Sequence, residues 1–508
     1  MSAAKVAAID KPTEIVTPKV KRLPYPFKDK RALDFDMLYQ LSSMSVIASA
    51  GVPRKLIFEH ASRLPCSAAE YFKKIDLTCE KLKYDYAKGC RLVAENTKET
   101  KMREFLLRFS SSLLSGEPEA DFLVRETKAL ADDYDNDYGR KLEGLKLWSD
   151  AYVSLILSAV LIIIMGIVST MIWPVSMGFL FGLVILSAGT TAIGVWILYL
   201  MSPREPVVVR VAGSREQKLG AKIFRMGLPA VSIVGALIIL MKLNTGWFFL
   251  AVAAFAFPIG LVMEKDDKQV AKRDSEIGTF LASLGGICGA IGTTVKEALS
   301  RIDLESLNCL RNDVKRLYVR LKSGITPGLC WQKLIEETGS ELVNRTVGMF
   351  YDAIAMGGDA EQAGHNAFLF SSKVATLRAK RRTIAIPFRW LTIAMHMAVV
   401  GLLVFITEVI TRFGNMIGQA EKSMPQVGGS SGISAFSTFN IAGLSTLHTM
   451  VVPLLLVFTV ANTMAPAIVE GGSWYKAFFN LGILASVSGL SLLILPALAT
   501  ALFKTVQI

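Results

Sequence analysis

The chain of 508 residues lacks the motifs with which proteins bind nucleotides or catalytic metals. No Gly-x-x-x-x-Gly-Lys-Ser/Thr run occurs, which excludes a P-loop, and the glycines at 285–289 follow no strand pattern, so they make a poor dinucleotide fingerprint. The four histidines are scattered and form no His-Glu-x-x-His zinc motif. We therefore expect no enzymatic activity, no cofactor and no metal site, and we expect a partner to supply any energy.

Cysteine is also scarce. The six cysteines all fall in two charged stretches of the chain, and none forms a Cys-x-x-Cys pair. Small buried thiols in a reducing compartment are the simplest account of this usage. We therefore expect the charged stretches to lie in the cytosol.

Acidic residues are outnumbered, with 43 Asp and Glu residues against 56 Lys and Arg residues and a net charge of +13. The basic residues cluster next to long apolar runs, where membrane topology and anionic lipid account for them. We therefore expect membrane lipid, and not nucleic acid, to face this charge.

Apolar residues are abundant and are concentrated in long runs. Only 19% of the residues are charged, and the mean hydropathy is +0.43. A run of about 20 apolar residues predicts a membrane-spanning helix, because an α-helix rises about 1.5 Å per residue and the hydrocarbon layer is about 30 Å thick. Seven runs qualify, and they are 151–173, 177–201, 226–241, 247–263, 386–411, 441–464 and 477–503. The chain is predicted to be an all-α polytopic membrane protein.

Basic residues predict the orientation of these spans. The linker at 202–225 is rich in Lys and Arg, and positions 371–390 hold six basic residues and no acid. The positive-inside rule puts both segments in the cytosol and the Gly- and Ser-rich loop 412–440 outside. Residues 1–30 carry lysines and prolines without an apolar core, so we expect a disordered cytosolic tail and no cleavable signal peptide. The expected location is the plasma membrane, with a cytosolic amino terminus.

A helix-patterned block repeats at an offset of 241 residues. Ten identical pairs support the repeat: Ser42/Ser283, Gly51/Gly292, Lys55/Lys296, Lys74/Lys315, Lys81/Lys322, Glu95/Glu336, Thr97/Thr338, Phe109/Phe350, Gly116/Gly357 and Arg140/Arg381. Identity alone is weak, but both copies share a small-residue first helix ending at glycine and a last helix that continues into an apolar run. We infer an internal duplication.

These signals divide the chain into seven segments. After the tail come a first helical block (31–150), a transmembrane hairpin (151–201), the basic linker (202–225) and a second hairpin (226–263). A second helical block (264–385) and three further spans with the outer loop (386–508) follow. In the second block, four glycines between 285 and 292 predict tight helix packing, because glycine costs an isolated helix up to about 1 kcal/mol.

Ionisable residues are rare within the predicted spans. Glu408 and His448 fall near the outer ends, where solvated headgroups account for them. His396 lies deeper, and an intramembrane ionisable residue is by default a functional hypothesis.

Two helical blocks that each run into a membrane helix resemble the platform proteins of type II secretion, type IV pilus and archaellum machines. The residues that carry the resemblance are the run LSSMSVIASAGVP at 41–53, the helix at 105–116 before Glu117 and Pro118, and AMGGD at 355–359 with Glu361. It covers residues 31–411. Bacterial members have three spans, whereas this chain places four apolar runs between the blocks, which is similar to the longer archaeal-type members.

The resemblance implies a membrane anchor that has no catalysis of its own and works as a homodimer. A cytosolic hexameric ATPase would move it, so that pilin-like subunits pass from the bilayer into an archaellum, an adhesive pilus or another filament. The basic residues predicted to contact the ATPase are Arg204, Arg210, Arg215, Lys218, Arg381 and Arg382. Two other classes remain open: a secondary transporter built from an internal repeat, and a membrane signalling scaffold.

Overall fold

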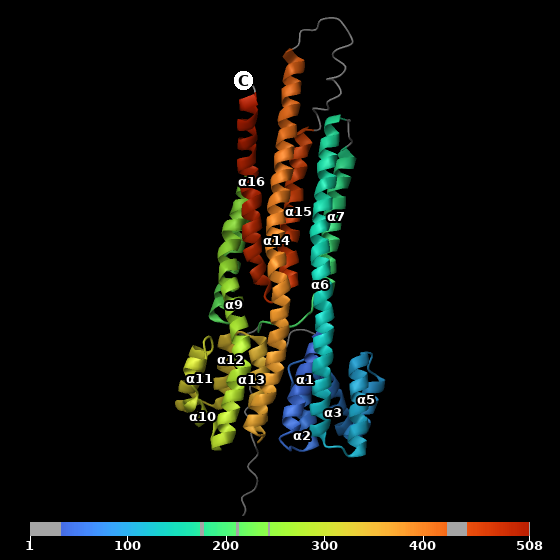
Figure 1. The fold of residues 1–508 in the computed structure, drawn as a ribbon, viewed down its shortest axis with the longest axis vertical. Helices are drawn as coiled ribbons and strands as arrows, with labels where there is room; N and C mark the ends of the chain where they lie inside the picture. Colours follow the sequence, from blue (N-terminus) through green and yellow to red (C-terminus); the bar gives the residue numbers. More distant parts are fainter. Residues whose placement is uncertain (1–31, 173–176, 210–212, 242–243, 424–443, 507–508) are drawn as a thin grey trace, which may run out of the picture. The chain divides into compact units, whose positions relative to one another are not determined.

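The structure, a computed structural model, describes residues 32–172, 177–209, 213–241, 244–423 and 444–506. Within these ranges the chain forms sixteen α-helices and short 3-10 turns, with no β-strand (Figure 1). The predicted all-α fold is confirmed. The predicted disordered tail at 1–30 and most of the predicted outer loop at 412–440 lie outside the described residues, and helix α14 extends through Ser423.

Seven helices are long and apolar enough to cross a membrane, as the sequence predicts. They are α6 (Glu119–Ile172), α7 (Met177–Met201), α8 (Arg215–Leu240), α9 (Gly246–Ile291), α14 (Ala360–Ser423), α15 (Leu444–Glu470) and α16 (Ala477–Val506). Four of these helices begin or end well outside the apolar run, because polar residues with good helix propensity extend them. The final part of the predicted linker is helical for this reason, since α8 begins at Arg215.

The described chain divides into two compact units. Unit 1 holds the residues up to Leu130 and Arg273–Ser372, so it contains most of both helical blocks. Unit 2 holds Ala131–Val209, Gly213–Lys272 and the chain from Lys373 onward, so it contains the apolar runs. Helices α6, α9 and α14 are each continuous across a boundary between the units.

The helices of unit 1 repeat at the predicted offset. The first copy contains α1 (Leu33–Ala48), α2 (Arg54–Arg63), α3 (Ala69–Leu82), α4 (Tyr86–Glu95) and α5 (Thr100–Ser115). The second copy contains the end of α9, then α10 (Val295–Arg301), α11 (Arg311–Lys322), α12 (Pro327–Thr338) and α13 (Glu341–Ala355). Each helix of the second copy begins within one residue of the position that the offset of 241 gives, apart from α9, which begins earlier and ends two residues beyond the position that the end of α1 gives.

Several of the identical pairs have matching structural roles. Gly51 and Gly292 both take a positive φ at a helix end, at 68° and 65°. Phe109 and Phe350 are both fully buried on α5 and α13. The pairs therefore mark positions that the fold of one block requires, which supports the duplication.

A buried arginine joins the two copies within unit 1. Arg345 on α13 is fully buried, and its guanidinium lies 2.8 Å from a carboxylate oxygen of Asp36 on α1 and 3.1 Å from Glu341. The same guanidinium lies over the rings of Phe35 and Tyr39, at 4.5 Å and 4.8 Å from their centroids. Charge pairing and cation–π attraction thus act at one contact between the copies.

The small-residue face of the second copy packs as predicted. A methyl group at Gly285 on α9 would collide with the carbonyl oxygen of Ala360, and one at Gly364 on α14 would collide with that of Leu281. Glycine at both positions lets the two helix backbones approach closely, which recovers part of the propensity cost through packing.

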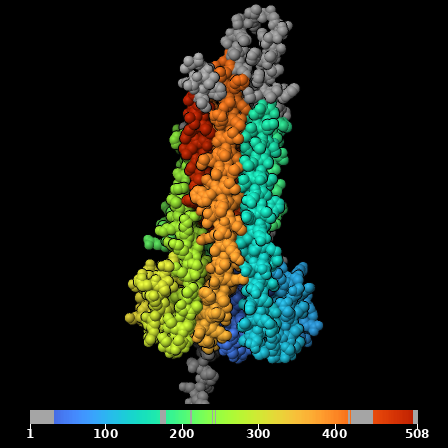
Figure 2. Space-filling view, viewed as in Figure 1, coloured from blue at the N-terminus to red at the C-terminus, as the bar shows by residue number. Residues whose placement is uncertain are grey.

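The apolar helices of unit 2 pack side by side (Figures 1 and 2). Helix α6 packs on α7 through Tyr152 and Gly194, and α15 contacts both α7 and α16. Helix α16 packs closely on α9, because Gly260 faces the backbone of Phe479. On the face seen in Figure 2, the apolar part of α14 lies between α6 and α16.

Candidate functional site

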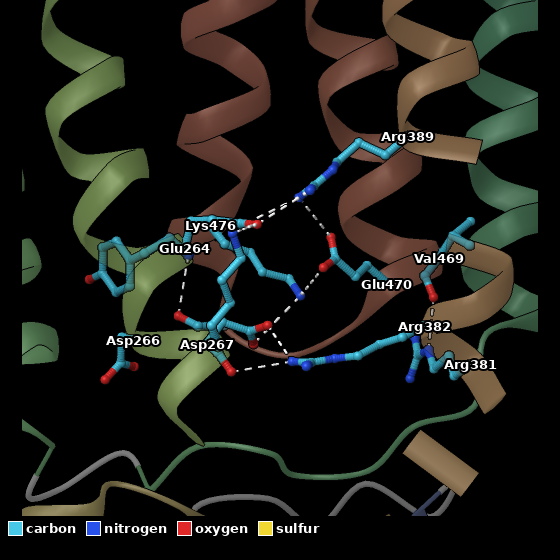
Figure 3. Close-up of polar contacts among 12 residues, drawn as sticks. Glu264, Asp266, Asp267, Arg381, Arg382, Arg389, Val469, Glu470 and Lys476 are labelled. Atoms are coloured by element: carbon cyan, nitrogen blue, oxygen red, sulfur yellow. Dashed lines mark hydrogen bonds and ion pairs between the residues drawn. The ribbon is translucent and has the colours of Figure 1, made fainter. Parts of the chain in front are cut away.

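Charged side chains meet in unit 2 at one place, which we call the polar junction. They come from α9, from α14, from the last residue of α15 and from the short turn between α15 and α16 (Figure 3). Seven charged residues form the junction, and Asp266 lies beside them: Glu264, Asp267, Glu470, Arg381, Arg382, Arg389 and Lys476. Opposite charges that lie in contact offset part of the cost of burying one another.

Arg381 closes the end of helix α15. Its side chain is 5% exposed, and its guanidinium donates to the carbonyl oxygens of Ile468 and Val469 at 2.8 Å each. The same group donates to the Pro203 carbonyl at 2.9 Å and the Ser202 hydroxyl at 2.6 Å. A cation at the carboxyl terminus of a helix donates hydrogen bonds to carbonyl groups that have no partner within the helix, and it interacts favourably with the negative end of the helix dipole. Arg381 therefore holds α14, α15 and the start of the linker together.

The six charged residues other than Arg381 alternate in sign along a chain of contacts. Arg382 donates to Asp267 at 2.6 Å, and the Lys476 ammonium lies 3.7 Å from Asp267 and 3.2 Å from Glu470. Arg389 then lies 3.6 Å from Glu470 and 3.1 Å from Glu264. Each inner residue of this chain has an opposite charge on both sides, which is the arrangement that offsets desolvation best.

Gly471 makes room for this geometry. Its φ of 70° lies in the left-handed region, where a side chain is strained. A Cβ atom at this position would also lie 2.6 Å from the guanidinium carbon of Arg381. Glycine is therefore needed both to end α15 and to admit the arginine.

The basic linker is attached to unit 2 at both of its described ends. Ser214 and Gln217 cap α8 reciprocally, each side chain accepting from the other residue's backbone N–H, and both donate to buried Asp266. At the other end, Glu205 accepts hydrogen bonds from Arg378 at 3.1 Å and from the Tyr138 hydroxyl at 2.9 Å.

The six predicted ATPase-contact residues fall into different environments. Arg381 and Arg382 are engaged in the polar junction, and Arg204 stacks over the ring of Tyr199 at 3.9 Å. Arg210 lies outside the described residues. Arg215 and Lys218 are exposed at the start of α8, so these two cations are accessible to a partner.

A second polar cluster lies among the apolar helices of unit 2. Its five side chains are Tyr152 on α6, His396 on α14, Thr459 and Asn462 on α15, and Ser488 on α16. None is more than 3% exposed. The intramembrane histidine of the sequence analysis is therefore one member of an interhelical network.

The hydrogen bonds of this cluster run in one direction. The Tyr152 hydroxyl donates to the Asn462 carbonyl oxygen at 2.9 Å, and the Asn462 amide lies 3.1 Å from Nδ1 of His396. Because an amide N–H can only donate, Nδ1 accepts and Nε2 carries the proton toward Ser488 at 3.0 Å. Ser488 then donates to Thr459, whose own hydroxyl donates to the Leu455 carbonyl. His396 therefore accepts one hydrogen bond and donates another within this network.

Other predicted features occupy ordinary positions. Glu408 pairs with Arg412 one turn later at 2.7 Å, and the side chain of His448 lies outside the described residues.

All six cysteines are free thiols, five of them buried. Burial raises the pKa of Cys66 to about 12 and that of Cys79 to about 11. Across the residues that the structure describes, no cluster of three or more His, Cys, Asp or Glu side chains fits a metal ion.

The sequence analysis missed the acids of the polar junction and the partners of His396. Asp267 and Glu470 bind bases that are 115 and 81 residues away along the chain, so local spacing carries no trace of these pairs. One signal was available: Thr459 and Asn462 are polar residues three positions apart in an apolar run, which places them on one face of a helix.

Two curated relatives are similar to part of the chain. The flagella accessory protein J of Methanocaldococcus jannaschii is 25% identical over 342 residues, which cover 64% of this chain and 60% of that protein. The protein of the same name from Methanococcus voltae is 22% identical over 327 residues, which cover 62% of this chain and 58% of the relative. No family model matches the chain, and no solved structure matches it. The chain thus aligns with about three fifths of each of two archaeal flagella accessory proteins.

Proposed function

We propose that this protein is the membrane platform of a type IV filament machine of the archaellum kind. The similarity to two archaeal flagella accessory proteins carries this proposal. The seven apolar helices support a multi-pass membrane protein, and the duplicated helical block supports the resemblance to platform proteins. The platform has no catalysis of its own and lies in the plasma membrane with its amino terminus in the cytosol.

The platform couples a cytosolic hexameric ATPase to the transfer of pilin-like subunits from the bilayer into the filament. Mechanical coupling needs stiff connections, and α6, α9 and α14 are continuous helices between the helical blocks and the apolar runs. The polar junction then ties α9, α14 and the α15–α16 turn together, so that they move as one body. The working form is a homodimer in membrane lipid.

Among the six basic candidates, Arg215 and Lys218 are the ones proposed to meet the ATPase. Both are exposed, whereas Arg381 would have to release four hydrogen bonds to reach a partner. Charge reversal at Arg381 or Arg382 therefore tests folding, and charge reversal at Arg215 and Lys218 tests docking.

The proposal is tested in cells and with purified protein. Deleting the gene should abolish filaments, and the purified chain in detergent should retain the filament ATPase on a column. The double variant Arg215→Glu/Lys218→Glu should weaken this retention, whereas Lys146→Glu, another exposed lysine of unit 2, should not. Normal filaments in the deletion strain would contradict the proposal and favour a signalling scaffold.

The transporter alternative rests on His396. Both ring nitrogens of this histidine are engaged by Asn462 and Ser488, and the side chain is fully buried, which favours a structural role. Ion or substrate flux in proteoliposomes that His396→Ala abolishes would support transport instead.

A further inference from the structure

Helix α8 packs on α9 through one face, and three glycines define that face. An added Cβ atom at any of the three would come within 3.1 Å of a side chain of α9, and the pairs are Gly220 with Met263, Gly227 with Phe255 and Gly235 with Phe248. Successive residues of an α-helix are turned by about 100°, so the three glycines fall within about 80° of one another around α8. These close contacts fix the rotation of α8, and its opposite side faces away from α9.

The side of α8 opposite the glycines carries positive charge over its first three turns. Four exposed residues, which we call the basic stripe, lie there within about 80° of one another: Arg215, Lys218, Lys222 and Arg225. In the part of the chain that the structure describes, none of the four forms an ion pair. The acid of these turns, Glu216, lies on the side of the glycines. The charge of the basic stripe is therefore uncompensated within the described chain.

The same side of α8 becomes apolar where the basic stripe ends. Its outward residues are strongly exposed, with Met226 at 69%, Ile233 at 66% and Leu240 at 83%. They belong to the apolar part of a helix that is long enough to cross a membrane, so hydrocarbon is the environment that suits them. One side of one helix thus presents cations and then apolar side chains, in the order in which a membrane lipid presents its headgroup and its acyl chains.

The spacing along α8 divides the basic stripe into two halves. At about 1.5 Å per residue, Arg225 and Lys222 lie about 2 Å and 6 Å before Met226, whereas Lys218 and Arg215 lie about 12 Å and 17 Å before it. The headgroup layer on one side of a bilayer is about 6 Å thick. Lys222 and Arg225 are therefore at the depth of the headgroups, and the other two cations lie beyond it.

The other basic segment next to an apolar run is already engaged within the chain. All six bases at 371–390 have partners: Lys373 and Lys380 bind Asp135, Arg378 binds Glu205, Arg381 binds carbonyl groups, Arg382 binds Asp267 and Arg389 binds Glu264. These bases need no lipid to balance their charge. The lipid contact expected from the clustered bases is therefore better placed on α8.

We propose that Lys222 and Arg225 bind the phosphate of an anionic membrane lipid, whose acyl chain lies along Ile233 and Leu240. The two cations are neighbours on the helix surface, and charge-assisted hydrogen bonds to phosphate are strong. A zwitterionic headgroup carries its own cation, so the pair selects against it. The bound lipid fixes the depth of α8 in the bilayer, and with it α9. The inference goes beyond the proposed function, because it leaves Arg215 and Lys218 to the ATPase.

Native mass spectrometry of the full chain in detergent tests the site. Phosphatidylglycerol, which is anionic, and phosphatidylcholine, which is zwitterionic, are added separately with the same acyl chains, and the affinity of the first bound lipid is measured. A base near an anionic surface contributes roughly fivefold in affinity, so Lys222→Gln/Arg225→Gln should weaken phosphatidylglycerol binding by about 30-fold and leave phosphatidylcholine binding unchanged. Equal affinities of the wild type for the two lipids, or wild-type binding by the variant, would overturn the inference.

Two matched variants separate the position of the charges from their number. Lys222→Arg/Arg225→Lys keeps both charges in place and should bind phosphatidylglycerol like the wild type. Lys296→Gln/Lys315→Gln removes two exposed charges from unit 1 and should also bind like the wild type. A 30-fold loss in either variant would contradict a site that recognises charge at these two positions.

A photoreactive probe locates the acyl chain. A benzophenone amino acid replaces Ile233 in the full chain, which is reconstituted in nanodiscs that contain both lipids. Its adducts should be mainly with phosphatidylglycerol, and Lys222→Gln/Arg225→Gln should abolish this preference. The same probe at Ile193, an exposed apolar position on α7, should form adducts in proportion to the two lipids. Adducts in that same proportion at Ile233 would overturn the inference.

The remaining outcomes distinguish lipid from other partners. Inorganic phosphate at the concentration of the lipid should not displace it, because phosphate gains nothing from Ile233 and Leu240; displacement would assign the cations to a soluble anion. Lys222→Gln/Arg225→Gln should still retain the filament ATPase on a column. Loss of that retention with unchanged lipid binding would assign the pair to the ATPase and overturn the inference. Failure of the wild-type chain to retain the ATPase would contradict the proposed function alone.

Discussion

Replacing Arg345 should open the contact between the two copies of unit 1. Arg345→Met removes the ion contacts to Asp36 and Glu341, at 2.8 Å and 3.1 Å, and the attraction to the two rings beneath the guanidinium. Breaking a buried ion pair costs about 3–5 kcal/mol. Methionine keeps most of the apolar stem, and Ser67 still donates two hydrogen bonds to Asp36, so we expect the lower end of this range.

Hydrogen exchange followed by mass spectrometry measures this cost on the two helices concerned. A loss of about 3 kcal/mol corresponds to roughly 150-fold faster exchange of the most protected amides in α1 and α13. Arg316→Met is the matched control, because Arg316 is half exposed and its buried partner Asp313 keeps its ion pair with Arg273 at 3.0 Å, so we expect a loss of about 0–1 kcal/mol. Its exchange should change by less than about sixfold.

A double variant separates the effect of the unpaired Asp36 charge from the effect of the changed side-chain shape at position 345. In Arg345→Met, the Asp36 carboxylate remains buried without its cation, so adding Asp36→Asn should restore part of the protection. Two results would refute the reasoning: exchange in Arg345→Met within twofold of the wild type, or a double variant that is less protected than the sum of the single variants predicts.

Four further predictions concern other parts of the chain. Gly471→Ala should lower stability by about 1–2 kcal/mol through left-handed strain, and more if it displaces Arg381, which thermal unfolding in detergent would show. His396→Ala leaves two buried hydrogen-bonding groups without a partner, so a stability loss of about 2 kcal/mol is expected, whereas His396→Gln should lose less. Under native conditions a thiol reagent should label Cys309 before the five buried cysteines, and equal labelling of all six would contradict the observed burial. Burial raises the pKa of Glu337, but hydrogen bonds from Arg320 and Arg316 outweigh burial, so the pKa lies below its usual value. The ionised carboxylate therefore stabilises the fold at neutral pH, and this stabilisation is lost as pH falls below about 4.5. Glu337→Gln should therefore destabilise by up to about 1 kcal/mol at pH 7, with the difference from wild type vanishing in acid.

The sequence predicted the elements of this fold well. Long apolar runs identify helices because their length must match the hydrocarbon layer, and the predicted bounds of α7 agree with the structure at both ends. Gly51, Gly292 and their equivalents marked helix ends because few other residues adopt a positive φ without strain. These signals are local, so they can be read without the fold.

The identical residue pairs were a poorer guide to the register of the repeat. Lys74/Lys315 and Lys81/Lys322 match at the offset of 241, but the buried faces of α3 and α11 are related by 242 residues, so these lysines are not equivalent. Surface lysines are frequent in both blocks and coincide easily. Buried faces define the register because packing limits which residues can occupy them.

The contacts of the candidate site could not be predicted. Arg381 and Arg382 stand in a run of bases that suggests a free cationic face, yet their partners lie 88 and 115 residues away along the chain. Pairing across such distances depends on how the helices are arranged, which the spacing of residues along one helix does not contain.

The polar junction implies that its cations serve the protein twice, at different times. In the proposed orientation, Arg381, Arg382 and Arg389, which have no acid near them in the sequence, favour the cytosolic side during membrane insertion, before the helices pack. The acids that pair with Arg382 and Arg389 lie on α9, which is synthesised before the arginines, and at Glu470, the last residue of α15, which is synthesised after them. The contacts of Arg389 with Glu470 and of Arg381 with the end of α15 therefore form only after α15 has been made, so the last hairpin completes the junction around arginines that are already in place.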